Sequence, residues 1–257
     1  MVFRWLRGEA RSNRIGKLPA GEAVYAVGDV HGRLDLLQDL LDLIMDDARH
    51  ASDARRSLVF LGDYIDRGLE SRAVLDLLLR DPLPGFDTIR LKGNHEDALL
   101  SFLDGRTDGR DWLTFGGLET LMSYGVSLRS RPQTDDAIGS LRLSAKAAIP
   151  KGHVDLMRAC RLYHQAGDYV FVHAGVRPGV PLERQSATDM MWIRDVFLNS
   201  REPLPGHVVV HGHTICDQPQ DRRYRINIDT GAFASGRLTC LVLRDADRRF
   251  LCTEPSC

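Results

Sequence analysis

The chain has 257 residues, of which 43% are hydrophobic and 27% are charged. Its 34 basic and 35 acidic residues nearly cancel, which argues against the broad electropositive surface of a nucleic-acid-binding protein. No run approaches the ~20 apolar residues that span a bilayer. The first residues lack the apolar segment of a secretory signal, and the five cysteines form no CxxC pair. We therefore expect a cytoplasmic protein with no nucleic-acid partner and no membrane association.

Short apolar runs that end in glycine recur along the chain and predict buried strands. Between the first three runs, leucines at three- and four-residue spacing predict amphipathic helices over 33–49 and 70–81. This alternation predicts an α/β fold. The predicted strands with their polar ends are 23–32, 57–68, 88–96, 169–175 and 207–214.

Residues 97–165 differ from the rest, because helical patterns replace the strand pattern. The segments 95–105, 111–125 and 153–167 are predicted helices. The strand pattern resumes afterwards, so we expect a helical insertion around 97–165 within one domain that spans 1–257. The tail, 225–254, alternates apolar and polar residues between glycine and aspartate turns, which predicts β-hairpins that close a sheet.

Polar residues follow the apolar run of each predicted strand. Asp29, Asp63 and Asn94 stand 34 and 31 residues apart, about one βαβ unit, so their strand ends should meet at one sheet edge. His31 points to the same side as Asp29 in an extended chain, and two later strands end in histidine. A helix cap or a core histidine would explain any single member. The joint set of oxygen and nitrogen donors suits two adjacent divalent ions that share a carboxylate.

Five sequence blocks stand at these strand ends. They are GDVHG (28–32), GDYIDRG (62–68), GNHE (93–96), HAG (173–175) and HGHT (211–214). In this order they resemble the signature of PPP-type serine/threonine protein phosphatases, which belong to the calcineurin-like metallophosphoesterases. GDYIDRG is the specific block, because its Asp-Arg ending is typical of the PPP branch. MMWIRDVFL (190–198) and INIDTGA (226–232) are also similar to segments of small bacterial members.

The resemblance implies a fold and a metal centre. The fold is α/β, with two mixed β-sheets packed as a central sandwich flanked by helices, in four layers. Two divalent ions are implied, with manganese as first choice and iron or zinc as alternatives. The implied ligands are Asp29, His31 and Asp63 for one ion, and Asp63, Asn94, His173 and His213 for the other. A shared carboxylate reduces the repulsion between two cations. The role of His211, where eukaryotic relatives carry arginine, stays open.

The resemblance also implies a reaction, the removal of phosphate from phosphoserine or phosphothreonine of proteins by direct attack of a metal-bridging hydroxide. His95, oriented by Asp66, matches the proton donor to the leaving alkoxide. Arg67 would bind the phosphoryl oxygens, and Arg194 is a candidate second clamp. Asp66 could instead be a turn residue, and Arg194 could form a surface ion pair with Asp195.

Two other functions stay open at this point. A symmetric diadenosine tetraphosphate hydrolase would use the same dimetal chemistry, with its substrate chosen by 97–165 and 215–225. An aromatic base-stacking pocket would favour the dinucleotide, and an open shallow groove would favour a protein substrate. A catalytically silent binding module usually loses a ligand or the acid, yet every matched position is present here. The remaining histidines are expected to be structural or exposed: His50, His153, His164 and His207.

Overall fold

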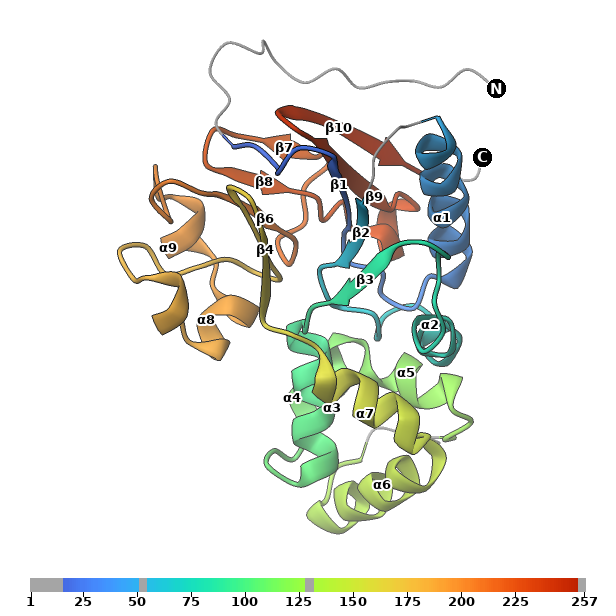
Figure 1. The fold of residues 1–257 in the computed structure, drawn as a ribbon. Coiled ribbons are helices and arrows are strands. Elements are labelled where there is room, and N and C mark those ends of the chain that lie inside the picture. The colour runs from blue at the N-terminus through green and yellow to red at the C-terminus, as the bar shows by residue number, and fades with distance from the viewer. Residues whose placement is uncertain (1–15, 51–54, 128–131, 254–257) are drawn as a thin grey trace.

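The computed structural model describes residues 16–50, 55–127 and 132–253. Within these residues the strands form two five-stranded sheets, with helices on their outer sides (Figure 1). Residues 1–15, in which we predicted no secretory signal, lie outside the described part of the chain.

The first sheet is mixed, in the order β10-β9-β1-β2-β3. Its strands are β1 (Glu22–Val27), β2 (Arg55–Phe60), β3 (Asp87–Arg90), β9 (Thr239–Arg244) and β10 (Asp247–Cys252). The first three run parallel, because α1 (Leu34–Arg49) and α2 (Ser71–Leu78) connect them by crossovers. Antiparallel β9 pairs with β1 and β10 pairs with β9, so the hairpin predicted in the tail is confirmed and closes this sheet.

The second sheet is also mixed, in the order β4-β5-β6-β8-β7. Its strands are β4 (Tyr163–Ala166), β5 (Tyr169–Val172), β6 (Val208–His211), β7 (Gln220–Asp221) and β8 (Arg225–Asn227). The predicted helix over 153–167 is wrong beyond Ala159, because β4 pairs antiparallel with β5. Between the two strands lies a two-residue turn in which Gly167 has a positive φ of 55°.

The core lies in three apolar layers, because alternate residues of each strand face opposite sides. Val24 and Ala26 of β1 belong to the cluster between the sheets, which includes Phe171 of β5. Tyr25 faces the other way and packs with α1 and α2. Outside the second sheet, α8 (Ala187–Trp192) and α9 (Asp195–Leu198) pack against β5 and β6. The predicted sandwich of two mixed sheets flanked by helices is confirmed.

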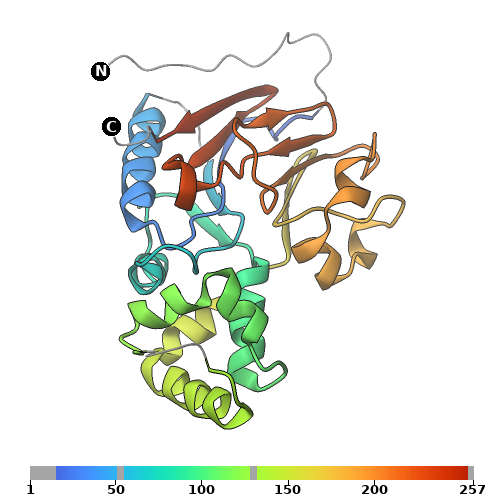
Figure 2. The same cartoon turned by 180° about the vertical axis from the view of Figure 1, so that it is seen from behind.

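A helical lobe, residues 94–159, connects β3 to β4 and extends from one end of the sandwich (Figures 1 and 2). Its elements are α3 (Asn94–Asp104), α4 (Arg110–Trp112), a π-helical segment (Leu113–Gly117), α5 (Leu118–Ser123), α6 (Asp135–Ala148) and α7 (Lys151–Ala159). The helix predicted over 111–125 is interrupted at Gly116, whose φ is 115°. That this lobe is an insertion within a single domain stays a prediction. Two short helices complete the fold, a 3-10 turn (Leu182–Arg184) and α10 (Ala232–Ser235).

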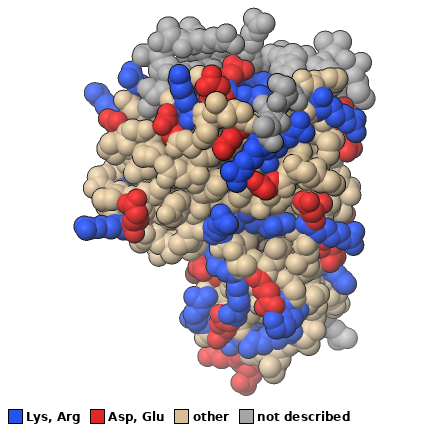
Figure 3. All heavy atoms as spheres, viewed as in Figure 1, with Lys and Arg blue, Asp and Glu red and all other residues tan. Residues whose placement is uncertain are grey.

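Charged side chains of both signs are mixed over the face in Figure 3. Among the described residues, no helix combines the length and the apolar character needed to cross a membrane. The four described cysteines are all free thiols: Cys160, Cys216, Cys240 and Cys252.

Candidate active site

Strand ends from both sheets converge on one buried cluster. The first sheet contributes a residue pair after β1, Asp63 after β2 and Asn94 after β3, and the second sheet contributes the ends of β5 and β6. Burial is nearly complete, because no side chain of the set is more than 7% exposed. The set brought together is the one predicted from the sequence: Asp29, His31, Asp63, Asn94, His173 and His213.

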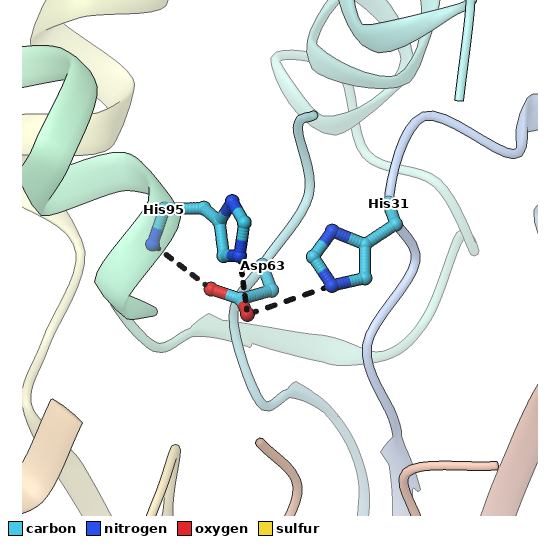
Figure 4. Close-up of side chains that lie close together, drawn as sticks. All are labelled: His31, Asp63 and His95. Atoms are coloured by element: carbon cyan, nitrogen blue, oxygen red, sulfur yellow. Dashed lines mark hydrogen bonds and ion pairs between the residues drawn. The ribbon is translucent and has the colours of Figure 1, made fainter. Parts of the chain in front are cut away.

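Asp63 lies in the middle of this cluster. Its Oδ2 is 3.7 Å from Nε2 of His31 and 3.4 Å from Nε2 of His173. Two groups of possible metal ligands, each with its ligand atoms within 4.8 Å of one another, share this carboxylate. One group adds His31 and His95, which Figure 4 shows on either side of Asp63, and the other adds His173 and His213. A carboxylate between two groups is suited to bridge two cations.

Hydrogen bonds to the backbone orient two of the imidazoles. His31 donates from Nδ1 to the carbonyl of Ile65 at 2.9 Å, and His173 donates from Nδ1 to the carbonyl of Leu61 at 3.1 Å. Each ring therefore turns the lone pair of Nε2 toward Asp63, the tautomer that a metal requires. Burial also holds the pKa of both rings well below the ordinary histidine value, so both are neutral.

The contact between His173 and Asn94 shows that this position suits a cation. Nε2 of His173 is 2.9 Å from Oδ1 of Asn94, while Nδ1 of the same ring faces the Leu61 carbonyl. A neutral imidazole has one ring proton and cannot serve two acceptors. A cation that accepted the lone pairs of Nε2 and Oδ1 would remove this conflict. The donor set at this position therefore fits a metal.

Asp29 supplies a second indication that this cluster suits a cation. Its Oδ2 accepts the backbone N–H of His213 at 3.0 Å, while its Oδ1 is buried without a hydrogen-bond partner. Burial, and then the carboxylate of Asp229, raises the pKa of Asp29 well above its ordinary value. A bound cation would compensate such a buried, unpaired carboxylate.

Two glycines of the sequence blocks leave room for these carboxylates. A Cβ on Gly93 would lie 2.0 Å from Oδ1 of Asp63, and a Cβ on Gly212 would lie 2.1 Å from Oδ1 of Asp29. Any larger residue would push the carboxylate away. The blocks GNHE and HGHT therefore require glycine for a steric reason.

His95 has a different environment from the other imidazoles. Its Nδ1 donates to Oδ2 of Asp66 at 2.6 Å, and its Nε2 is 3.8 Å from Oδ2 of Asp63. Burial opposes a positive charge here, but the two carboxylates outweigh it and raise the pKa of His95 to about 9. A protonated imidazole donates hydrogen bonds and cannot ligate a metal. His95 belongs to a ligand group by distance alone. Its bond to the Asp66 carboxylate favours a role as proton donor instead.

The two candidate arginines border the cluster. Arg67 is exposed, and its guanidinium lies over the ring of Phe233 at 4.4 Å. Phe233 is itself 5.4 Å from the ring of His31. Arg194 donates from Nε to Nε2 of His213 at 3.1 Å. The alternative explanation of Arg194, an ion pair with Asp195, is not observed among the described residues.

Two acidic residues belong to the site although the sequence analysis gave them no role. Glu96 is fully buried and accepts the backbone N–H groups of Asp63, Tyr64 and Gly93 at 2.8 to 2.9 Å. Its place in the GNHE block was the available signal. Asp229 follows β8 and is 2% exposed, and it accepts the N–H of Gly231 at 2.9 Å. The pattern of a polar residue at a strand end could have found it.

The other histidines lie outside both ligand groups. His211 is buried against Phe197, with 4.9 Å between the ring centroids, and its Nε2 has no hydrogen-bond partner. The remaining four are His50, which is exposed, and His153, His164 and His207, which contact neighbouring side chains.

This chain is similar in sequence and in fold to known phosphatases and tetraphosphatases. A bis(5'-nucleosyl)-tetraphosphatase PrpE [asymmetrical] of Bacillus mycoides (strain KBAB4) is 26% identical over 234 residues, which cover 84% of this chain and 88% of the relative. The crystal structure of a candidate diadenosine tetraphosphatase matches with a TM-score of 0.63 at 20% identity, over 95% of this chain and 99% of that one. A protein serine/threonine phosphatase of Saccharomyces cerevisiae matches with a TM-score of 0.53 at 15% identity, over 92% and 81%. At such identities the two structures show a common fold.

The family model for calcineurin-like phosphoesterases matches residues 23–228. This range contains all the cluster residues that follow strands of either sheet. A metallophosphoesterase of this kind is a hydrolase with a dimetal site. The buried donor set around Asp63 fits such a site, and the chain belongs to the calcineurin-like phosphoesterase family.

Proposed function

We propose that the chain is a phosphomonoesterase that removes phosphate from phosphoserine or phosphothreonine in proteins. Asp29, His31 and Asp63 would hold one divalent ion, and Asp63, Asn94, His173 and His213 would hold the other. Manganese is the proposed metal, because carboxylate and amide oxygens suit it, and iron or zinc are the alternatives, because imidazole nitrogens suit them. When bound, the ions would supply an activated water and would neutralise charge on the phosphoryl oxygens.

The observation that carries the proposal is the buried pair of His95 and Asp66. A serine or threonine alkoxide is a very poor leaving group and needs a proton as it departs. Asp66 binds Nδ1 of His95, so Nε2 is the nitrogen that would donate, and it faces the centre beside Asp63. Nitrophenolate and nucleotide phosphates leave without such help, so an oriented acid is most useful for an alkyl ester.

Arg67 and Arg194 are the proposed phosphate ligands. Arg67 precedes Gly68 in the GDYIDRG block, and its guanidinium is held over Phe233. Arg194 donates to Nε2 of His213, a nitrogen that a metal would use. We expect bound metal to free the Arg194 guanidinium, whose planar donors then match two phosphoryl oxygens.

Leaving-group dependence tests the proposal. With Mn²⁺-loaded protein, His95→Asn should lower turnover of a phosphoserine peptide by about 10²–10⁴-fold and turnover of p-nitrophenyl phosphate far less. His164→Asn, a half-buried histidine stacked on Phe171 outside the site, is the matched control. A folded, metal-loaded protein that hydrolyses neither substrate would refute the phosphomonoesterase. An equal loss on both substrates would refute the role of His95.

A second candidate is the hydrolysis of diadenosine tetraphosphate, which the similarity to the asymmetrical bis(5'-nucleosyl)-tetraphosphatase of Bacillus mycoides favours. Two aromatic rings support it. Trp192 is 40% exposed and 6.2 Å from the ring of His213, and the ring of Phe233 is 5.4 Å from that of His31. Either ring could stack on a nucleobase.

Trp192→Ala separates the two candidates. If a base stacks on this ring, the KM for diadenosine tetraphosphate should rise about tenfold, since such stacking contributes ~1–3 kcal/mol per base. The KM for p-nitrophenyl phosphate should not change. Product analysis then distinguishes the symmetric reaction, which yields two molecules of ADP, from the asymmetric one, which yields ATP and AMP. Absence of dinucleotide turnover in metal-loaded protein would remove this candidate.

A further inference from the structure

The carboxylate of Asp66 accepts hydrogen bonds from two residues of the helical lobe as well as from His95. Its Oδ2 accepts Nε1–H of Trp112 at 2.8 Å, beside the 2.6 Å bond from His95. Its Oδ1 accepts the hydroxyl of Thr120 at 2.5 Å. Trp112 ends α4 and Thr120 lies in α5, 46 and 54 residues after Asp66. Both oxygens of the carboxylate are therefore held from the lobe.

The lobe also contacts the backbone around Asp66. Asp66 and Arg67 have positive φ values of 72° and 69°, which non-glycine residues adopt only when their surroundings hold them. The N–H of Asp66 donates to the hydroxyl of Thr120 at 2.8 Å and to that of Ser71 at 3.0 Å. The N–H of Arg67 donates to the carbonyl of Gly116, in the π-helical segment, at 3.3 Å.

These contacts are almost completely shielded from water. Asp66 and Thr120 are 0% exposed and Trp112 is 3% exposed. Water cannot replace a donor lost at such a place, so the carboxylate would turn or shift to find another partner. Since Asp66 is the only partner of Nδ1 of His95 among the described residues, the ring would move with it.

We propose that Trp112 and Thr120 are positioning residues for the proton donor: they fix the carboxylate of Asp66 and thereby aim Nε2 of His95 at the centre. The helical lobe would thus orient the proton donor, while the strand ends position the metal ligands. The inference rests on the proposed role of His95 as the acid. Misplacement of a reacting group by about 1 Å can cost about 10²-fold in rate.

Four variants test the inference. Thr120→Val removes both bonds between the hydroxyl and Asp66, and its contact with Ser71, with little change in volume, whereas Thr120→Ser keeps the hydroxyl. Trp112→Phe removes the indole donor but keeps a ring on Phe102, with which Trp112 now packs at 5.2 Å between centroids. Tyr124→Phe is the matched control, because it removes a buried hydrogen bond of the lobe, to Nδ1 of His153 at 2.7 Å.

The first readout is kcat with two substrates in Mn²⁺-loaded protein. Thr120→Val and Trp112→Phe should each lower kcat for a phosphoserine peptide about 10–100-fold and kcat for p-nitrophenyl phosphate much less. Thr120→Ser should restore most of the rate, and Tyr124→Phe should match the unaltered protein. Equal losses on both substrates, or a Thr120→Ser variant as impaired as Thr120→Val, would overturn the inference.

The second readout does not depend on activity. The Nδ1 proton of His95, bound to a carboxylate, should give a downfield proton resonance that disappears in His95→Asn. This resonance should shift in Thr120→Val and Trp112→Phe but not in Tyr124→Phe. An unchanged resonance in folded Thr120→Val or Trp112→Phe would overturn the inference. If the resonance shifts as expected but His95→Asn shows no leaving-group dependence, the proposed acid role is wrong while the positioning is supported.

Discussion

The strand-end cluster and the Asp66 loop (residues 64–68) lie side by side, yet they are held in different ways. The cluster holds itself, because its contacts run between strand ends and adjacent backbone, as between Asp29 and the N–H of His213. The Asp66 loop also bonds to the cluster, through the carbonyl of Ile65 and the ring of His31. Its Asp66 carboxylate and Arg67 N–H, however, are bound by Trp112, Gly116 and Thr120 of the helical lobe. Damage to the cluster should therefore abolish metal binding, whereas damage to the lobe should disturb catalysis and leave the ligands in place.

Asp63→Asn should have the largest effect, because it replaces the carboxylate that both ligand groups share with a neutral amide. We expect activity to fall at least ~10³-fold, which corresponds to several kcal/mol of transition-state stabilisation. Elemental analysis after equilibration with Mn²⁺ should find fewer bound ions. An unchanged metal content would mean that Asp63 is no bridge and that the two groups bind independently.

Glu96→Gln should show how far the cluster supports itself. The amide of glutamine would place an N–H group against a backbone N–H that now donates to Glu96. We expect the free energy of unfolding to fall by about 2–3 kcal/mol, since hydrogen bonds to a buried charged group are lost. Chemical denaturation measures this change. Stability equal to that of the unaltered protein would show that these bonds do not hold the turn at Asp63.

Gly116→Ala tests the contact between the lobe and Arg67. A Cβ at Gly116 would lie 2.4 Å from the backbone N of Arg67, and its φ of 115° is unfavourable for alanine. Gly125→Ala is the control, because its φ is 78° but no atom lies within 4 Å of the added Cβ.

Both alanine variants should lose about 1–2 kcal/mol of stability from backbone strain, with the larger loss at Gly116. Only Gly116→Ala should lower turnover, while the metal content stays the same in both. If Gly125→Ala lowers turnover equally, the contact with Arg67 has no special importance for catalysis.

The pH dependence of the lobe should give the smallest effect. Burial lowers the pKa of His153, and Arg72 acts in the same direction, while Asp76 opposes them. The hydroxyl of Tyr124 is hydrogen-bonded to Nδ1 of the same ring. Below about pH 6.5 the unfolded state takes up a proton that the folded state excludes, so stability falls as the pH falls.

One excluded proton changes the free energy of unfolding by at most about 1.4 kcal/mol per pH unit. Replacing His153 with Gln should remove this contribution and flatten the dependence below pH 6.5. Denaturation curves at several pH values measure it. Identical slopes for both proteins would show that His153 titrates alike in the folded and unfolded states.

The sequence by itself determined the parts of the site that lie at strand ends. Apolar runs with glycine stops are local patterns, and they placed Asp29, Asp63 and Asn94 just after successive parallel strands. Parallel strands joined by crossover helices align their carboxyl ends, so local order along the chain became proximity in space. The sandwich of two mixed sheets followed from the resemblance that these same blocks carry.

Only the tertiary structure decided the surroundings of Asp66 and of His95, the proposed proton donor. Trp112 and Thr120 reach Asp66 across 46 and 54 residues, and no periodicity records such a contact. The same reason explains the error at 163–166, where pairing with β5 overrode a helical pattern, and the interruption at Gly116, which close approach to Arg67 requires. Local sequence sets strands, helices and turns, whereas contacts between distant segments depend on how those elements pack.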